Sequence, residues 1–272
     1  MNQVCRKVFS HAALLLALAG CAQVNTTNSG VVGINRSQSM WLSAQEVEQS
    51  SAKSYAGQVS QARSAGKLNT DKVLTARVKR VAQRLIAQTP VFRPDAAKWK
   101  WEVNVAQTQE LNAYAMAGGK IMVYSGLVTR LQLTDDEMAA VIGHEIAHAL
   151  REHSRETLSQ AYAQQMGLSV VGTLAGLNQS QLNLAGMVTD VTLSKPHSRT
   201  MESEADIIGL ELMARAGYNP NAAVNVWNKM MSAGGGSGPE FLSTHPSGPT
   251  RISDLQAHIP QVMPLYLQAR RG

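Results

Sequence analysis

The sequence predicts an α+β fold that is mainly helical and contains a small sheet. Apolar residues recur at helical spacing over several long segments, whereas alternation of apolar and polar residues is confined to about 99–105 and 120–124. The 272 residues, 44% of them hydrophobic and 16% charged, have the composition of a globular protein with one main domain. A mean hydropathy of −0.14 and one long apolar run exclude a disordered chain and a polytopic membrane protein.

The N-terminus has the pattern of a secretory signal. Arg6 and Lys7 precede an apolar stretch over 11–19, which ends in Leu-Ala-Gly-Cys at Cys21. This pattern resembles the signal of bacterial lipoproteins and predicts cleavage of residues 1–20 and a lipid anchor at Cys21; an uncleaved signal anchor is the alternative. Ala22 then favours the outer membrane, so we expect a lipid-anchored protein of the bacterial cell envelope that faces the periplasm.

Charge and cysteine content limit the possible partners. Without residues 1–20, which hold two basic and no acidic side chains, the formal charge falls from +6 to +4. The basic residues form no stripe with aromatic residues, so no nucleic-acid partner is expected. The two cysteines lie within the first 21 residues, so a metal in the folded part must take nitrogen and oxygen ligands.

The segment 21–66 is expected to contain a polar tether followed by a first helix. Residues 22–40 are rich in Asn, Ser, Thr and Gly, which predicts a segment that does not fold. Ser43 and Glu46 form a capping box for a helix that runs to about Ala65, where Gly66 ends it.

The main domain is expected over 67–272 and begins with a helix and two strands. Thr70 and Asp71 start a helix whose apolar stripe continues until Pro90. Alternation around 99–105 predicts a half-buried strand, and the segment 120–124 predicts a second.

Further helices fill the rest of the main domain. Thr134 and Glu137 form a capping box for a helix that reaches at least 152. Later helices are expected over about 166–188, 199–216, 220–232 and 250–258, with a glycine-rich loop at 234–238.

The helix after Thr134 contains the sequence HEIAH over 144–148. Two histidines four residues apart lie on one helical face, so the imidazoles of His144 and His148 can reach one metal ion. Glu145 is rotated by about 100 degrees from His144 and is placed to act as general base on a water. The alternative is two structural histidines on a surface helix.

A catalytic zinc site needs a third protein ligand and one open position. His153 is too near in sequence to fold back onto the same metal. Glu202 is the predicted third ligand, and Asp206, four residues later on the same face, is expected to accept a hydrogen bond from a ligating histidine, His144. Glu204 is expected to point elsewhere and to be solvated. The alternative is that Glu202 and Asp206 are two surface acids.

Four motifs together resemble the zinc endopeptidases of peptidase family M-48, in the gluzincin clan. They are HEIAH at 144–148, ESEAD at 202–206, NAYAMAGGKIMVYSGL at 112–127 and STHPSGPTRI at 243–252. The resemblance covers about residues 70–260. Among the family's members, the chain most resembles the small bacterial lipoprotein peptidases.

The resemblance implies roles that spacing alone does not. The strand from about Met116 to Tyr124 would be an edge strand beside the cleft, on which an extended peptide pairs. The implied substrate-binding residues are Asn112, Ala115, Met116, Ala117 and Gly118. His245 resembles the family's mobile histidine, either stabilising the oxyanion or occupying the fourth zinc position, and Arg251 resembles its electrostatic partner; a loop histidine and a surface arginine without roles are the alternatives.

These observations predict a zinc endopeptidase, with one Zn²⁺ per chain, that cleaves unfolded or misassembled cell-envelope proteins. Its expected partners are these substrates, the membrane through Cys21, and envelope proteins. One alternative is a chaperone-like or regulatory zinc lipoprotein with little proteolysis. Another is a zinc hydrolase of cell-wall amide bonds.

Overall fold

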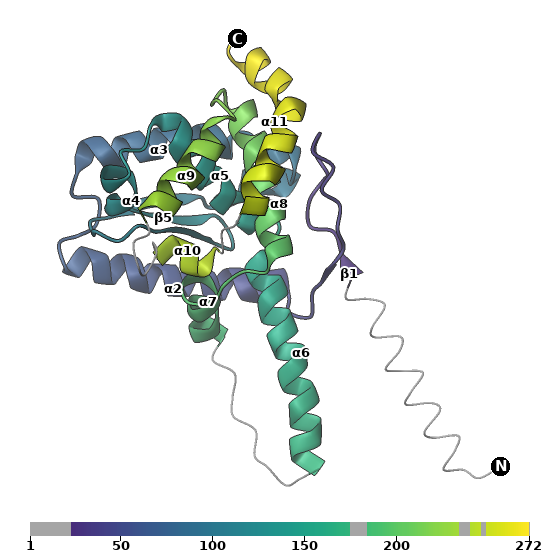
Figure 1. Ribbon diagram of the computed structural model, residues 1–272. Coiled ribbons are helices and arrows are strands. Elements are labelled where there is room, and N and C mark those ends of the chain that lie inside the picture. The colour runs from purple at the N-terminus through teal and green to yellow at the C-terminus, as the bar shows by residue number, and fades with distance from the viewer. Residues whose placement is uncertain (1–22, 175–183, 234–239, 246–248, 272) are drawn as a thin grey trace.

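The computed structural model describes residues 23–174, 184–233, 240–245 and 249–271. The predicted signal peptide, Cys21 and the glycine-rich loop lie outside the described residues. The predicted α+β, mainly helical fold is confirmed (Figure 1). No helix within the described ranges has both the length and the hydropathy needed to cross a bilayer.

The elements follow one another along the chain as short strands, two helices, a small sheet and then helices. They are β1 Gln23–Val24, β2 Gln38–Ser39, α2 Ala44–Ser64, α3 Lys72–Ile86, η1 Thr89–Val91, η2 Pro94–Lys98, β3 Glu102–Ala106, β4 Ala113–Met116, β5 Lys120–Tyr124, α4 Ser125–Arg130, α5 Asp135–Leu150, α6 His153–Leu174, α7 Leu184–Leu193, α8 Arg199–Arg215, α9 Ala222–Ser232, α10 Glu240–Thr244 and α11 Pro249–Ala269. The three predicted N-caps form as expected, with capping boxes at Ser43 and Thr134 and a side-chain cap at Asp71.

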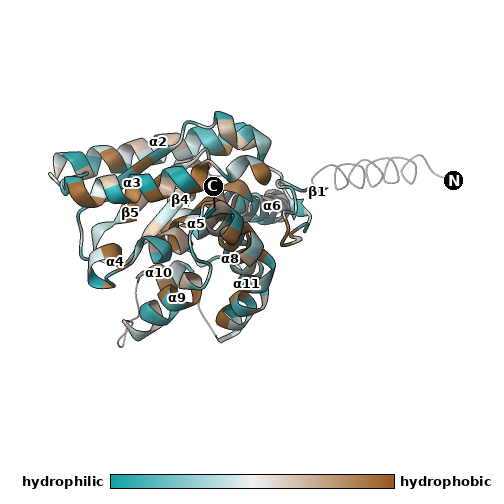
Figure 2. Cartoon of the chain, turned by 90° about the horizontal axis from the view of Figure 1, so that it is seen from above, coloured by the Kyte–Doolittle hydropathy of each residue, from teal (hydrophilic) through white to brown (hydrophobic). Residues whose placement is uncertain are grey.

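Helix α3 shows how the apolar pattern directs packing. Its apolar residues at helical spacing are buried, whereas Val73, which lies off this spacing, is 81% exposed. Brown and teal residues accordingly alternate along α3 in Figure 2. The helix therefore covers the sheet with one narrow face.

The expected strand over 116–124 is in fact two strands joined by a tight turn. Ala117, Gly118 and Gly119 form the turn, and the two glycines have φ of +75° and +79°, a left-handed conformation that glycine adopts most readily. The sheet order is β3-β5-β4, with β3 parallel and β4 antiparallel to β5. The edge strands are thus β3 and β4, and β5 lies in the centre; the edge next to α5 is β4, which corrects the expected position of the edge.

The sheet is covered on both faces. Ala113, Ala115 and Ile121 belong to the core shared with α3 and α5, whereas Tyr114 and Met116 pack with α2. In Figure 1, α2 runs beneath the sheet and α3 above it. The alternation of side chains along β4 therefore places one side of this strand against the helix that carries HEIAH.

Residues 23–40 do not form the expected unfolded tether. Val32, Gln38 and Met40 are buried, and β1 pairs with β2 in an antiparallel bridge. The segment lies against α6 and α8 and satisfies its polar groups with their side chains. Its composition was misleading because ion pairs and hydrogen bonds, together with a few buried apolar residues, fix it in place.

Two later helices also differ from expectation. The helix expected over 166–188 corresponds to parts of α6 and α7, with 175–183 outside the described residues. Helix α11 continues to Ala269 through Pro260 and Pro264, beyond the expected end near 258. Its packing against α8 provides contacts that offset the lost backbone hydrogen bonds.

Helices α5 and α8 pack closely where each has a glycine. A Cβ atom on Gly209 would lie 2.8 Å from the backbone nitrogen of His144 and 2.9 Å from the carbonyl carbon of Gly143. Backbone atoms cannot move as a flexible side chain does, so the two helices keep this distance only while residue 209 is glycine.

We expect Gly209→Ala to lower the free energy of unfolding by about 1–3 kcal/mol, because the added methyl group forces the two helices apart. Gly57→Ala is the matched control: Gly57 lies within α2 with no atom within 4 Å of an added Cβ, so stability should be unchanged or rise by up to about 1 kcal/mol. Urea unfolding followed by circular dichroism measures both. Equal stability of the two variants would show that the helix contact tolerates a side chain.

Candidate metal centre

The sequence HEIAH lies on the last turns of α5 and is completely enclosed. The side chains of His144, Glu145 and His148 are only 2–3% exposed. The capped start of α5 and the buried apolar residues around the motif fix the helix in the core. Both imidazoles consequently point toward the same side, one turn apart.

Helix α8 brings Glu202 to these two histidines. The Nε2 atoms of His144 and His148 lie 3.0 Å apart. The Glu202 carboxylate lies 3.3 Å from His148 Nε2 through Oε1 and 3.5 Å from His144 Nε2 through Oε2. The three residues predicted as metal ligands therefore do converge.

The spacing of these donors fits a tetrahedral metal. Bonds of about 2.0–2.1 Å at tetrahedral angles place neighbouring ligand atoms roughly 3.3 Å apart. The observed separations of 3.0–3.5 Å agree with this. Two imidazole nitrogens and a carboxylate oxygen, all buried, are also a donor set that binds Zn²⁺.

His245, at the end of α10, joins the same cluster. Its Nδ1 lies 3.2 Å from His144 Nε2 and 3.0 Å from Glu202 Oε1. Its Nε2 lies 3.4 Å from Glu145 Oε1. The four donor atoms of His144, His148, Glu202 and His245 all lie within 4.8 Å of one another, so His245 occupies the direction of a fourth ligand.

Asp206 and Arg251 support His144 from behind. Asp206 Oδ1 accepts a hydrogen bond from His144 Nδ1 at 2.9 Å, the contact expected from the sequence. Arg251 donates to both Asp206 oxygens at 2.7 Å and lies 2.7 Å from Glu202 Oε2. The guanidinium is buried over the Trp227 ring and braces the two acids.

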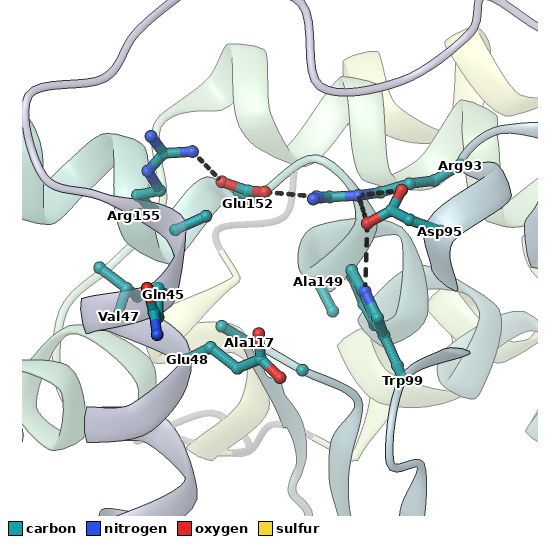
Figure 3. Close-up of a pocket in the computed structure, with 12 residues that line it drawn as sticks. Gln45, Val47, Glu48, Arg93, Asp95, Trp99, Ala117, Ala149, Glu152 and Arg155 are labelled. Carbon is teal, nitrogen blue, oxygen red and sulfur yellow. Dashed lines mark hydrogen bonds and ion pairs between the residues drawn. The ribbon is translucent and has the colours of Figure 1, made fainter. Parts of the chain in front are cut away.

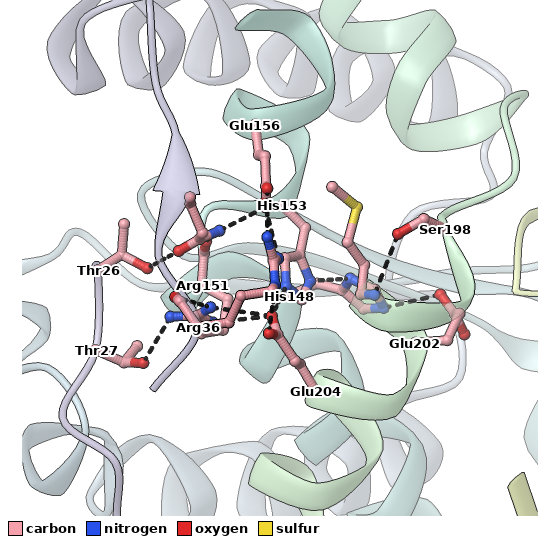
Figure 4. Close-up of polar contacts among 12 residues, drawn as sticks. Thr26, Thr27, Arg36, His148, Arg151, His153, Glu156, Ser198, Glu202 and Glu204 are labelled. Atoms are coloured by element: carbon pink, nitrogen blue, oxygen red, sulfur yellow. Dashed lines mark hydrogen bonds and ion pairs between the residues drawn. The ribbon is translucent and has the colours of Figure 1, made fainter. Parts of the chain in front are cut away.

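His148 has a longer chain of partners. Its Nδ1 lies 2.8 Å from His153 Nδ1, and His153 Nε2 lies 3.0 Å from Glu204 Oε2 (Figure 4). If His148 presents Nε2 to a metal, its proton is on Nδ1 and is donated to His153, which in turn donates Nε2–H to Glu204. Glu204 is 5% exposed, so the expectation that it is solvated was wrong.

Two arginines neutralise Glu204. Arg36 Nε lies 2.7 Å from Oε1, and Arg151 Nη2 lies 3.1 Å from Oε2. Arg36 also pairs with Glu156 at 2.6 Å. Arg36 belongs to the N-terminal segment, so residues distant in sequence close the hydrogen-bond network behind His148.

The pKa values reflect these contacts. Burial alone lowers the pKa of His144, but the carboxylates of Asp206 and Glu202 outweigh it and raise the value to about 9. Burial raises the pKa of Glu145 and lowers that of His148. Burial also acts to raise the pKa of Glu202, yet the surrounding histidines hold it below its ordinary value. Glu202 is therefore an anion. A metal cation bound beside it could take the place of the protons on the surrounding histidines.

The edge of the sheet meets the cluster at Ala115, whose backbone N–H donates to Glu145 Oε2 at 3.1 Å. Because Asn112 accepts from Tyr124 of β5, alternation directs the backbone groups of Ala113 and Ala115 to the edge of β4 that faces away from β5, and Ala117 follows at the start of the turn. Asn112 and Met116 instead face β5. Of the predicted substrate-binding residues, Ala115 is on the open edge and Ala117 and Gly118 are in the turn.

Sequence reasoning considered His153 only as a metal ligand and missed its contact with His148, and it missed His197 and Arg36 altogether. The ring of His197 stacks on His148 with centroids 4.3 Å apart. The signal that was present is the histidine distribution: five of the seven histidines gather here, namely His144, His148, His153, His197 and His245. No local pattern identifies Arg36.

We expect Glu204→Gln to lower the free energy of unfolding by about 3–5 kcal/mol, because it leaves the buried Arg151 without its partner. The zinc affinity should also fall by about 10–100-fold through the loss of support behind His148. Asp190→Asn is the control, since the Asp190–Lys195 pair is 48% and 57% exposed. Denaturation and competition with a chelator measure the two effects. Glu204→Gln behaving like Asp190→Asn would contradict the structural role of this network.

Several named proteins are similar to this chain. The mitochondrial metalloendopeptidase OMA1 of Saccharomyces cerevisiae is 35% identical over 178 residues, covering 62% of this chain and 50% of that protein. The metalloprotease YcaL of Escherichia coli is 30% identical over 57% of this chain and 61% of its own length. The beta-barrel assembly-enhancing protease of E. coli is 25% identical over 78% and 44%. The chain spans about half the length of the curated relatives it matches.

These relatives correct the expected location. Proteins named mitochondrial metalloendopeptidases from two yeasts, Arabidopsis thaliana and Bos taurus are 33–36% identical to this chain. The expectation of a bacterial cell-envelope protein conflicts with this finding and is withdrawn. The signal peptide and the lipid at Cys21, outside the described residues, stay predictions.

The family follows from the part of the chain that carries the site. The profile of Peptidase family M48 matches residues 72–259, which include β3 to β5, α5, α8 and α10. The match covers well over half of the chain and all the residues of the buried cluster. The chain belongs to Peptidase family M48.

Proposed function

We propose that this protein is a zinc-dependent endopeptidase that hydrolyses internal peptide bonds of unfolded or misassembled proteins. The observation that carries the proposal is the convergence of His144, His148 and Glu202, with Glu145 between them and the open edge of β4. A metal site without such an edge would have nothing to align a polypeptide.

His144, His148 and Glu202 would hold the zinc ion in this proposal. Bound there, zinc would lower the pKa of a water molecule and polarise the carbonyl group of the substrate. Asp206 and His153 would fix the imidazole tautomers, because each lies against the Nδ1 atom of one ligand.

Glu145 would move the proton. Its carboxylate is buried beside the cluster, and burial raises its pKa toward the range in which a carboxylate accepts a proton from water. The Ala115 N–H at 3.1 Å holds Oε2 in position. Glu145 would take a proton from water and later pass it to the leaving amine.

The edge strand favours an extended substrate. The backbone groups of Ala113 and Ala115 point away from β5, toward the side on which an added strand would pair. Their N–H groups are bonded to Asn112 Oδ1 and Glu145 Oε2, so a substrate strand would have to replace these two contacts. Folded proteins have already paired most of their backbone groups, so an unfolded chain is the better substrate.

His245 supports a second candidate, a zinc protein with little proteolysis. Four protein ligands are typical of closed structural sites, whereas catalytic sites keep one position open. With Nδ1 3.0–3.2 Å from Glu202 and His144, His245 fills that position. For an active peptidase, His245 must withdraw before a water can approach Glu145.

We expect Glu145→Gln to lower kcat by about 10²–10⁴-fold, because the general base is lost, while the zinc content stays at that of the wild type. The assay compares cleavage of an unfolded protein and its folded counterpart, with metal content measured on the same samples and a chelated sample as control. Internal cuts in the unfolded protein alone are expected. Equal cleavage of both forms, or full activity of Glu145→Gln, would overturn the proposal.

His245→Gln tests the closed arrangement. We expect zinc to bind more weakly and cleavage of the unfolded protein to become faster, because a competing ligand has been removed. His258→Gln is a control, since His258 hydrogen-bonds within α11 to the backbone of Asp254. Slower cleavage at full zinc occupancy would instead assign His245 a role in the reaction itself.

A further inference from the structure

We infer that a pocket beyond the end of β4 binds a basic side chain of the substrate, with Glu48 as its anionic partner. This inference rests on the proposed function, since it concerns a polypeptide that pairs with β4. It assigns a chemical preference to one position of that polypeptide.

The pocket lies where five segments meet. Its volume is about 280 Å³, and its walls come from the start of α2, from η2, from the β4–β5 turn, from the end of α5 and from the start of α6 (Figure 3). Pockets for drug-sized molecules measure about 300–1,000 Å³. This pocket therefore fits one long side chain rather than a separate ligand.

The position of the pocket follows from the register of β4. Ala115 N–H contacts Glu145, and Ala117, two residues further along the chain at the start of the turn, lines the pocket. Two residues of strand span about 6.6 Å. The opposite wall includes Ala149, directly after His148 in α5. The side chain that enters therefore belongs to a residue about two positions from the bond to be cleaved.

The charges of the pocket do not balance. Glu152 pairs with Arg155 at 2.5 Å and with Arg93, and Arg93 pairs with Asp95 at 3.1 Å (Figure 3). Two cations and two anions thus satisfy one another along one wall. Glu48 is the third anion of the lining and stands apart from this row. The pocket has one negative charge in excess.

Glu48 is held at the mouth of the pocket by the turn. A Cβ on Gly118 would lie 2.8 Å from Glu48 Cγ, so the side chain rests directly against the turn that follows β4. Val47, Ala117 and Ala149 supply apolar wall for the aliphatic stem of a lysine or arginine. A cationic head would then meet the Glu48 carboxylate.

A neighbouring hollow is lined by lysines and could favour an acidic substrate side chain instead. It measures about 560 Å³, shares Glu48 and Trp99 with the pocket, and is lined by Lys98, Lys100 and Lys120. If the positive charges of these lysines determined the electrostatic potential in the pocket, an acidic side chain of the substrate would be preferred. These three lysines line only the second hollow, however, and none of them lines the pocket.

The test uses the zinc-loaded full chain and unfolded peptides of one sequence, in which Lys, Ala or Glu is placed two or three residues to either side of the cleaved bond. At the position that reaches the pocket, we expect kcat/KM about 10-fold higher for Lys than for Ala, and lowest for Glu. Glu48→Gln should bring the ratio of Lys to Ala close to one, and Glu48→Lys should favour Glu. Glu110→Lys, an exposed acid before the other end of β4, should keep the preference for Lys.

A preference for Glu in the wild type, no preference at any position, or a preference for Lys that survives in Glu48→Gln would overturn the inference. If no peptide is cleaved at all, the proposed function fails separately. The same peptides are then titrated against Glu145→Gln by fluorescence anisotropy. Tighter binding of the Lys peptide, lost on adding Glu48→Gln, supports the pocket, and equal affinities overturn it.

Discussion

The close contact of α5 and α8 is the constraint on which the rest of the site depends. Gly143 and Gly209 face one another, so the two helix backbones approach more closely than side chains allow. At this distance the carboxylates of α8 reach the imidazoles of α5 by direct contact. A wider separation would place water between the histidines and their acids, and the donor atoms would no longer surround a single point.

Both histidines of HEIAH are oriented through Nδ1, but by different means. His144 is hydrogen-bonded through Nδ1 to Asp206, and Arg251 from the C-terminal helix α11 balances the negative charge of Asp206. His148 contacts His153 through Nδ1, and His153 contacts Glu204. Arg36 and Arg151 balance the negative charge of Glu204. Each of these two series of contacts ends in an arginine, because burying a carboxylate without a positively charged partner would be costly. The two ends of the protein thereby fix the same pair of rings.

The register of β4 would link the metal centre to the proposed specificity. One set of alternate residues pairs with β5, and the other set, which includes Ala113 and Ala115, faces away from β5 on the side of Glu145. A substrate strand aligned on this edge would have its positions fixed relative to Glu145 in steps of about 3.3 Å. The charge imbalance near Gly118 then acts at a set distance from the reacting bond.

Local sequence determined the parts of the site that lie within single helices. Residues four apart share a helical face whatever surrounds them, so HEIAH and the pair Glu202 and Asp206 were recognisable, as were the capping boxes of α2 and α5. Tertiary structure decided the rest. Glu204 lies on the opposite face of α8 from Glu202, yet it is buried because the N-terminal segment covers that face, and a polar composition gave no sign of this. The identity of the edge strand depended likewise on a hairpin turn at two glycines, because strand pairing joins residues whose contacts the spacing of one segment does not encode.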